Sequence, residues 1–589
     1  MKGRPRTAAA GAVLEPPPLD ADQSDVAGVD ETERQIVLAP PGSGKTEVVA
    51  ALLESLYENG LEPRDEVLAI SFSRAAVSAL RRRVARGDSP APAIRTLDSF
   101  ASRMLDEIDD QEWRQLSFDK RIARALHLLE AGQEVTDLSM VRHLVIDEVQ
   151  DLVGVRARLA LAIIASLDED AGFTLLGDPD QAIYDFQLEH DSGLTSAGFV
   201  DQVRTLPRVV EKKLTHQYRA RTEEARRAAT MLAGIPTGHP RIAVVRDFLS
   251  GVTLGGDVGD VGRAACKWKG TTAFLCRTNG QALMVSRALR DAGCAVQTRA
   301  ASDELPVAAW IARTFVGVET PVVRRSEIED RLAVLAPMGA AEGWRLLKEA
   351  EHDFRVADRI DLKRLRAAIL RRNLPSELLD GATPGSMLVS TIHRAKGLEF
   401  DNVVLVNAAD LVAGDATEEE ASVAYVAATR PRDRLMAARI ELPRGLRSDQ
   451  RTGRWILGGF KKWMTFGFEV RGGDTIAAGE SSHEPLPIGT KVTATLDRSL
   501  SSLDLPVYSL EADGRIVART TEEFGEALAR RLGSAHDRKG LPWPDISDLA
   551  MESVETRATP VVDIGFAGLE VGMRIAGMAD LDWHGKDYR

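Results

Sequence analysis

The stretch that decides the fold is Ala39-Pro40-Pro41-Gly42-Ser43-Gly44-Lys45-Thr46, which joins two segments of different character. The apolar run 36–38 before it is typical of a buried strand, and residues 47–57 after it are compatible with a helix. A glycine-bearing loop that ends at a helix start directs backbone N–H groups and the positive end of the helix dipole at one point, where an anion can bind. The stretch therefore predicts a phosphate-binding loop.

The side chains at the end of this loop predict what it binds. Lys45 can reach the β- and γ-phosphates of a nucleotide, and the Thr46 hydroxyl is a suitable ligand for Mg²⁺. Ala39 stands where the strict pattern of P-loop NTPases has its first glycine, so a glycine-rich turn before an ordinary helix is an alternative. The strand before the loop and the helix after it favour the nucleotide site, with ATP and Mg²⁺ as the expected cofactors.

Length, charge and cysteine content limit the class of protein. A chain of 589 residues suggests three to four domains at roughly 150 residues each. The net charge of −13 argues against a surface that binds polyanions everywhere, but it allows one local basic groove. Three cysteines cannot form a paired disulfide framework, which favours a reducing, cytoplasmic compartment. Residues 1–19 lack the apolar region of a signal peptide and are expected to be a disordered tail, and no apolar stretch reaches the length of a membrane span.

A second motif follows the apolar run 144–146, where the sequence continues Asp147-Glu148-Val149-Gln150-Asp151. A short apolar run closed by paired acids indicates a buried strand that delivers carboxylates at its C-terminal end. Ligands of open α/β sheets bind at that end. We therefore expect Asp147 to hold Mg²⁺ and Glu148 to position or activate the attacking water. The alternative is an acidic turn after a core strand.

A third motif follows the apolar run 173–176 and includes residues 177–186. Gln181 is a polar side chain that could sense a γ-phosphate. Tyr184 and Phe186 follow closely and could stack on nucleic-acid bases, which requires exposed rings. The alternative is that both rings belong to the core.

With these three motifs in order, the sequence resembles the superfamily 1 helicases of the UvrD/Rep/PcrA type. Later blocks extend the resemblance: His216-Gln217-Tyr218-Arg219, the segments 274–279 and 424–430, and above all Val389-Ser390-Thr391-Ile392-His393-Arg394-Ala395-Lys396-Gly397-Leu398-Glu399-Phe400. The motifs span about residues 20–440. The resemblance implies an α/β fold of two RecA-like P-loop NTPase domains with reduced helical insertions, with ATP at their junction.

The resemblance also implies roles for individual residues. Gln23 would read the adenine edge and Tyr218 would stack on the adenine, while Arg219 and Arg430 would stabilise charge on the transferring phosphoryl group. The catalytic set is then Glu148, Gln181, Arg219 and Arg430, and the metal ligands are Thr46 and Asp147. The nucleotide would contact Gln23, Gly42, Ser43, Gly44, Lys45, Thr46, Tyr218 and Glu399. Single-stranded nucleic acid would contact Phe72, Thr96, Tyr184, Phe186, Thr391 and His393.

Several positions depart from the family pattern. Glu47 stands where an arginine that packs on the adenine is usual, Asp98 replaces a histidine in a strand-contact loop, and Gln187 replaces a basic residue. Each change removes a positive or stacking contact. The gaps at about 102–140 and 300–385 are short for the helical insertions of the family. Together these features indicate a trimmed motor whose ability to unwind a duplex cannot be assumed.

The expected domain order is a tail at 1–19, a first RecA-like domain at 20–207, a second at 208–440, and a basic linker helix with a β-rich accessory domain at 441–589. In the basic segment 444–463, arginines and aromatic residues alternate, which suits either a backbone-binding surface or a solvated helix packed on the motor. Strands are expected at 490–496, 507–510 and 515–518, followed by a helix at 521–532. Residues 577–582 resemble a nuclease signature only weakly, and a final hairpin strand is the alternative.

The resemblance implies a 3′-to-5′ DNA helicase or translocase that acts on single-stranded DNA in repair or replication. The alternative is a partner-dependent regulatory ATPase subunit of a nuclease or anti-phage assembly, which would unwind little alone. That alternative rests on the short insertions, the missing groove cations and the extra C-terminal domain. A protein partner would then bind through the C-terminal domain.

Overall fold

The computed structural model describes residues 18–72, 74–84, 92–108, 113, 116–188, 193–235, 239–299, 305–351, 356–372, 374–379, 387–459, 461, 464–477, 486–534, 536–538, 540, 542–558 and 568–583. These residues form two compact units. Unit 1 contains the residues before 73 together with 79–179 and 187–217. Unit 2 contains 74–78, 180–186 and the residues from 218 onward. The segment 180–186 thus leaves unit 1 and returns to it.

Unit 1 is built on a parallel sheet with the strand order β3-β2-β4-β5-β1-β6. Its central strands are buried on both faces, as continuous apolar runs require. The strands are β1 (Arg34–Leu38), β2 (Val67–Ser71), β3 (Ala93–Thr96), β4 (His143–Asp147), β5 (Gly172–Gly177) and β6 (Val209–Lys213). The helices are α1 (Ala21–Ala27), α2 (Lys45–Glu58), α3 (Arg74–Val84), α4 (Leu97–Glu107), α5 (Phe118–Glu130), α6 (Thr136–Ser139), α7 (Gly154–Ala165) and α8 (Ser196–Arg204), with residues 74–78 of α3 counted in unit 2.

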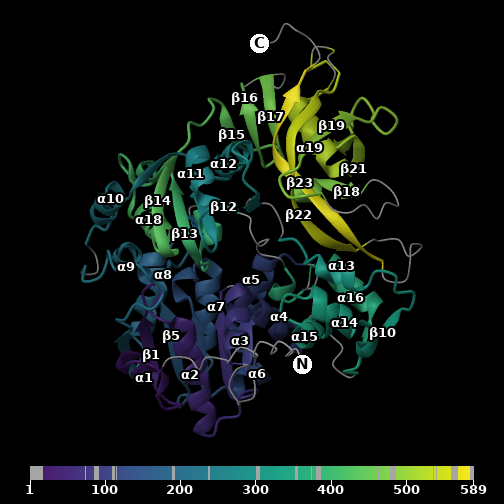
Figure 1. Ribbon diagram of the computed structural model, residues 1–589. Coiled ribbons are helices and arrows are strands. Elements are labelled where there is room, and N and C mark those ends of the chain that lie inside the picture. Colours follow the sequence, from purple (N-terminus) through teal and green to yellow (C-terminus); the bar gives the residue numbers. More distant parts are fainter. Residues whose placement is uncertain are drawn as a thin grey trace, which may run out of the picture. The chain divides into compact units, whose positions relative to one another are not determined.

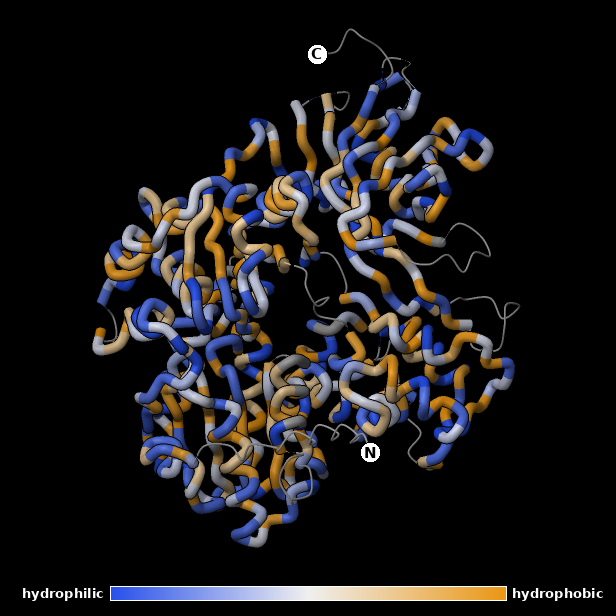
Figure 2. Tube along the Cα trace, in the orientation of Figure 1, coloured by the Kyte–Doolittle hydropathy of each residue, from blue (hydrophilic) through white to orange (hydrophobic). Residues whose placement is uncertain are grey.

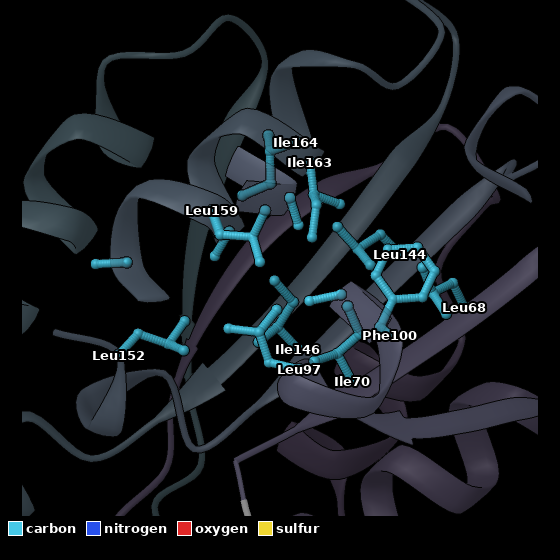
Figure 3. Packing of buried hydrophobic residues seen from close by; sticks show 14 of the residues in the cluster. Leu68, Ile70, Leu97, Phe100, Leu144, Ile146, Leu152, Leu159, Ile163 and Ile164 are labelled. Carbon is cyan, nitrogen blue, oxygen red and sulfur yellow. The ribbon is translucent and has the colours of Figure 1, made fainter. Parts of the chain in front are cut away.

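One core of unit 1 lies between the sheet and the helices α4, α5 and α7. Figure 3 shows side chains of this core, among them Ile70 of β2, Ile146 of β4, Leu97 and Phe100 of α4 and Ile163 of α7. Residues of the first insertion, among them Ile122 of α5, belong to the same core. This insertion is therefore part of the first domain, in agreement with the expectation of reduced insertions.

Unit 2 contains a second parallel sheet with the order β7-β14-β13-β8-β12-β9. The sheet confirms the second RecA-like domain. Its strands are β7 (Leu254–Asp257), β8 (Thr272–Cys276), β9 (Val296–Arg299), β12 (Met387–Thr391), β13 (Phe400–Val406) and β14 (Pro431–Arg439). Its helices are α9 (Glu223–Ala229), α10 (Ile242–Ser250), α11 (Val258–Ala265), α12 (Asn279–Asp291), α17 (Ile392–Ala395) and α18 (Glu418–Ala428). In Figure 2 the central strands are mainly apolar, while polar residues are spread over helices and loops.

The second insertion is a small subdomain with a core of its own, in which Trp310 and Trp344 are buried. A short antiparallel pair joins its helices. Its elements are α13 (Trp310–Thr314), β10 (Val322–Arg324), α14 (Arg325–Leu335), α15 (Ala340–Glu351), β11 (Arg359–Asp361) and α16 (Leu362–Leu370).

The C-terminal region is an antiparallel sheet with the order β15-β16-β17-β23-β22-β19-β20-β21-β18, which confirms the expected β-rich domain. Helix α19 packs on it through Phe524, whose ring contacts Phe468 and Tyr508 edge to face. The elements are β15 (Leu446–Asp449), β16 (Arg454–Gly458), β17 (Thr465–Val470), β18 (Thr475–Ala477), β19 (Lys491–Leu496), β20 (Tyr508–Ala512), β21 (Arg515–Thr520), α19 (Glu522–Leu532), β22 (Asp545–Ala558) and β23 (Leu569–Asp582).

The prediction of a basic linker helix after residue 441 is wrong. The segment instead forms the antiparallel strands β15 and β16, which pair from Leu446 with Leu457 to Asp449 with Arg454. Gly453 has a positive φ of 65° in the turn between them, a conformation that only glycine adopts easily. Arg454 and Ile456 are buried with the more exposed Trp455 between them, which is the alternation of a strand.

The hairpin β22–β23 belongs to the C-terminal sheet and also contacts the second insertion of unit 2. Figure 1 shows it in yellow, running from the C-terminal sheet to α13 and α16 of the second insertion. There the Thr556 hydroxyl donates to the carbonyl of Ala308 at 2.7 Å. At the other end Arg287 of α12 forms ion pairs with Asp548 and Asp580, both at 2.5 Å. Asp580 thus serves a structural ion pair, and among the described residues no group of three or more acidic, histidine or cysteine side chains could hold a metal ion.

One glycine of α12 is in close contact with an aromatic ring. The indole ring of Trp455 lies directly against Gly280 of α12, where a Cβ atom would come within 2.1 Å of it. Among the described residues, no helix is both long and apolar enough to cross a bilayer.

Candidate nucleotide and nucleic-acid sites

The loop between β1 and α2 has the geometry of a phosphate-binding loop. Gly42 and Gly44 have φ values of 78° and 83°, so both positions favour glycine. Gly44 precedes α2 directly, and the free N–H groups of the first turn point out of the helix start. Lys45 lies 3.4 Å from the Ala39 carbonyl and 3.4 Å from Glu148 Oε2. The loop therefore brings the lysine and the acidic strand end together.

The loop has the donors that a nucleotide needs. The Ser43 hydroxyl is buried and has no hydrogen-bond partner among the described residues, although buried hydroxyls are normally paired. Thr46 is exposed at the first turn of α2. An incoming phosphate would satisfy such groups, so the residues present fit ATP, and Thr46 with Asp147 fits the one or two protein ligands that Mg²⁺ usually takes beside phosphates.

The two acids expected to serve metal and water lie at the end of β4. Burial first, and then the charge of Glu148, raises the pKa of Asp147 to about 7, while Lys45 acts in the opposite direction. Glu148 has a left-handed backbone with a φ of 59°, which is uncommon for a residue other than glycine. Its carboxylate accepts a hydrogen bond from Gln150, whose own Oε1 accepts the Asp178 N–H at 3.0 Å. Gln150 thus orients Glu148, a role that the sequence analysis missed.

Gln23 and Gln217 both bond to the phosphate-binding loop. Gln23 Nε2 donates to the Ser43 carbonyl at 3.0 Å, and its Oε1 accepts the Asp20 N–H at 3.2 Å in a capping box of α1. Gln217 Nε2 donates to the Pro41 carbonyl at 2.5 Å. Gln23 is therefore placed beside the loop, but reading an adenine edge would require its amide to exchange these partners.

In unit 2, two residues of the predicted catalytic set are directly bonded. Arg430 is 2% exposed, and its Nη2 donates to Gln181 Oε1 at 2.8 Å. The guanidinium also donates to the Val426 carbonyl at 2.8 Å and to Thr429 Oγ1 at 3.1 Å. The motifs that carry Gln181 and Arg430, which lie 249 residues apart in the sequence, therefore form one buried polar network.

The same segment carries a ring expected to contact nucleic acid. Ile183 is fully buried in the core of the second RecA-like domain, and Lys396 Nζ donates to the Gln181 carbonyl at 2.6 Å. The Lys396 ammonium lies 5.0 Å from the centre of the half-buried Tyr184 ring, which is 6.5 Å from the His393 ring. Burial, Arg277 and Lys396 lower the pKa of His393 to about 4, so its ring is neutral at pH 7.

Arg219 and Glu399 also lie together, as a pair. Arg219 Nη2 is 2.7 Å from Glu399 Oε1, and Arg432 Nη2 is 2.7 Å from Glu399 Oε2. Burial acts to raise the pKa of Glu399, but the two arginines outweigh it and hold that pKa below the ordinary value. Tyr218, which precedes Arg219, is 44% exposed, as a ring that stacks on a base must be.

The remaining predicted contacts are spread over both units. Thr96 accepts the Ser99 N–H and caps α4, and Phe72 is half-buried. Thr391 is buried at the start of α17. The side chain of Phe186 lies outside the described part of the structure.

Two of the departures from the family pattern have partners. The Glu47 carboxylate accepts a hydrogen bond from Arg83 Nε at 2.6 Å. Asp98 forms an ion pair with Arg156 at 2.9 Å. In both cases, therefore, the negative charge of the carboxylate is balanced by the positive charge of an arginine in the same unit.

Two segments of the chain match families of known proteins. Residues 24–187 match the family described as an AAA domain, and residues 345–441 match the UvrD-like helicase C-terminal domain. The protein of Acanthamoeba polyphaga mimivirus named "Putative ATP-dependent DNA helicase R568" is 31% identical over 176 residues, which cover 28% of this chain and 25% of that protein. The ATP-dependent DNA helicase UvrD2 of Mycobacterium tuberculosis is 23% identical over 564 residues, which cover 70% of this chain and 78% of UvrD2.

A solved structure of the DUF1998 helicase MrfA bound to DNA and AMPPNP is 11% identical and covers 71% of this chain and 48% of that one. Its TM-score of 0.33 is too low to bear on the assignment. The ordered motifs, the two parallel sheets and the matches to both domains support the resemblance of this chain to the UvrD-like superfamily 1 helicases.

Proposed function

We propose that this protein hydrolyses ATP to move along single-stranded DNA in the 3′-to-5′ direction, in DNA repair or replication. The observation that carries the proposal is the segment 180–186. It holds Gln181 against Arg430, and three residues later it holds Tyr184 beside Lys396 and His393. One short segment thus joins a group expected to sense the nucleotide to a ring expected to contact a base.

In the proposed reaction, unit 1 binds the nucleotide. The N–H groups of residues 42–46 and the Lys45 ammonium hold its phosphates. Thr46 and Asp147 would hold Mg²⁺, which neutralises phosphate charge when it is bound. Glu148, oriented by Gln150, positions the attacking water and accepts its hydrogen bond.

In unit 2, Arg219 and Arg430 are the residues that the resemblance assigns to the charge of the transferring phosphoryl group. Arg430 is already held in a fixed position by its carbonyl and amide partners. Arg219 is paired with Glu399, so it must exchange that carboxylate for a phosphate oxygen during the reaction cycle. Because Arg432 also binds Glu399, the carboxylate keeps a partner when Arg219 leaves.

The first test is steady-state ATPase activity with and without a single-stranded oligonucleotide. The wild type should be stimulated strongly by DNA, and Lys45→Ala should lose activity under both conditions. The Arg263→Gln variant is a control, because Arg263 is exposed on α11 and pairs only with Asp260 among the contacts described. ATPase activity indifferent to any nucleic acid would rule out the proposed function.

A second function, a regulatory ATPase that unwinds little alone, is favoured by one observation. The first insertion packs into the core of unit 1 and adds no separate subdomain among the described residues. Duplex unwinding distinguishes the two functions. A processive monomer on a 3′-tailed duplex would exclude the second, whereas DNA-stimulated ATPase without unwinding, together with a stable partner in pull-downs, would support it.

A further inference from the structure

The phosphate-binding loop is followed directly by a carboxylate that a nucleotide site must accommodate. Glu47 is the third residue of α2, and its N–H donates to the Gly44 carbonyl at 2.9 Å, so it belongs to the first helical turn. The positive end of the helix dipole attracts this carboxylate and the phosphates of a nucleotide alike. An unbalanced negative charge at this place would therefore repel ATP and weaken its binding.

An arginine from another helix meets this carboxylate with two of its N–H groups. Arg83, near the end of α3, donates from Nε to Glu47 Oε2 at 2.6 Å and from Nη2 to Glu47 Oε1. Two-point pairs between arginine and a carboxylate are stronger and more directional than single contacts. The side chains of Arg83 and Glu47 are only 18% and 28% exposed, so dissolved salt screens their charges less than it screens fully exposed ones.

The pair depends on the position of Arg83 and not on the basic character of α3 in general. Arg81, two residues earlier, donates to the Ile94 carbonyl of β3 at 2.8 Å. Among the described side chains, Arg83 is the one that bonds to the Glu47 carboxylate. Both residues belong to unit 1, which also contains the phosphate-binding loop. The net charge beside that loop is therefore set by Arg83.

We infer that Arg83 is a positioning residue of the nucleotide site, which holds and neutralises the Glu47 carboxylate so that the triphosphate of ATP can bind at the start of α2. The inference rests on the proposed function, because it concerns the same ATP site. Arg83 acts through the charge of Glu47 and not by direct contact with the nucleotide. Its effect must then depend on whether residue 47 is charged and on how much charge the nucleotide carries.

The test measures the affinity of the full-length protein for ATP and ADP that carry a fluorescent N-methylanthraniloyl group, in the absence of DNA. The variants are Arg83→Gln, Arg83→Lys, Glu47→Gln and the double variant Glu47→Gln/Arg83→Gln. Arg158→Gln is the matched control, because Arg158 of α7 pairs with Glu130 of α5 at 2.8 Å in the same unit, and neither residue is expected to contact a nucleotide. Thermal unfolding shows whether each variant is folded.

The variants should differ in a pattern that only a charge effect produces. Arg83→Gln should weaken ATP binding about five- to tenfold, the order expected for one partly screened unit charge near a polyanion. Glu47→Gln should bind ATP at least as tightly as the wild type, and the double variant should return to within about twofold of it. Arg83→Lys keeps the positive charge and should retain most of the affinity.

The nucleotide and the salt concentration give two further checks. The loss caused by Arg83→Gln should be smaller for ADP than for ATP, because ADP carries less negative charge. It should also shrink when the ionic strength is raised to about 1 M, where the screening length falls to about 3 Å. Arg158→Gln should bind both nucleotides as the wild type does.

The outcomes separate this inference from the proposed function. If Glu47→Gln weakens ATP binding, or if the double variant binds no better than Arg83→Gln, the pair is structural and the inference is overturned. Unchanged affinity of a folded Arg83→Gln also overturns it, while the motor function stands. If Arg83→Gln does not fold, the affinity of Glu47→Gln decides. If the wild type binds no ATP, the proposed function fails and the inference fails with it, whereas the expected pattern without DNA-stimulated ATPase overturns the proposed function alone.

Discussion

Replacing Gln181 with alanine should weaken the coupling between the DNA strand and ATP hydrolysis. The change removes the 2.8 Å hydrogen bond from Arg430, which is 2% exposed and cannot turn to water. Hydrogen bonds to charged groups contribute about 1.5–3 kcal/mol. Because Arg430 keeps its bonds to the Val426 carbonyl and Thr429, we expect a loss of roughly 1.5–2 kcal/mol.

Since about 1.4 kcal/mol corresponds to a factor of ten in rate, DNA-stimulated kcat should fall roughly 10- to 30-fold. The assay is ATPase activity at saturating ATP, with and without oligo-dT, in a double-mutant cycle of Gln181→Ala and Arg430→Lys. Gln181→Glu keeps an acceptor oxygen and should retain more activity than alanine does. The reasoning is refuted if the two single losses add to within about 0.5 kcal/mol, because residues that act through one bond are not additive.

Three more predictions concern stability and chemistry. Burial lowers the pKa of His143 to about 4, so the free energy of unfolding should fall by up to about 3 kcal/mol as the pH drops from about 6.5 to about 4, and His143→Gln should remove this slope in chemical denaturation. Gly280→Ala should lower Tm, because the indole ring against it leaves no room for a Cβ, whereas Gly259→Ala, whose nearest neighbour would be at 3.7 Å, should be tolerated. Hydrogen peroxide should convert the thiols of Cys266 and Cys294, whose sulfur atoms are 3.5 Å apart, to a disulfide with loss of two hydrogen atoms, and peptide mapping without reductant that finds both as thiols would contradict this.

The sequence predicted the parts of the fold that have strong local signals. The loop before Lys45 and the acids after β4 are each set by a few neighbouring residues, and their strands are continuous apolar runs. The expected order of strands and helices followed from those signals. The reduced size of the first insertion was also visible, because chain length between motifs is read directly from the sequence.

Contacts between distant residues could not be predicted in the same way. The bond between Gln181 and Arg430 joins positions 249 residues apart, and the two motifs suggest separate roles for them. The ion pair of Glu47 with Arg83 was missed because a basic helix gives no sign of which arginine turns toward α2.

The wrong prediction of a helix in the C-terminal region has a different cause. The arginines and aromatic residues of the segment 444–463 give it the composition of an amphipathic helix. The segment nevertheless forms strands, because Gly453 allows a tight turn and β16 pairs with β17. Strand pairing depends on partners elsewhere in the chain, so composition is a weak guide to it.

The central claim is movement along a single strand, and displacement of streptavidin from biotinylated oligonucleotides tests it most directly. The wild type with ATP should release streptavidin from the 5′ end of oligo-dT much faster than from the 3′ end, and Lys45→Ala should release it from neither. Equal, slow release from both ends in the presence of DNA-stimulated ATPase would contradict translocation, and faster release from the 3′ end would contradict the proposed direction.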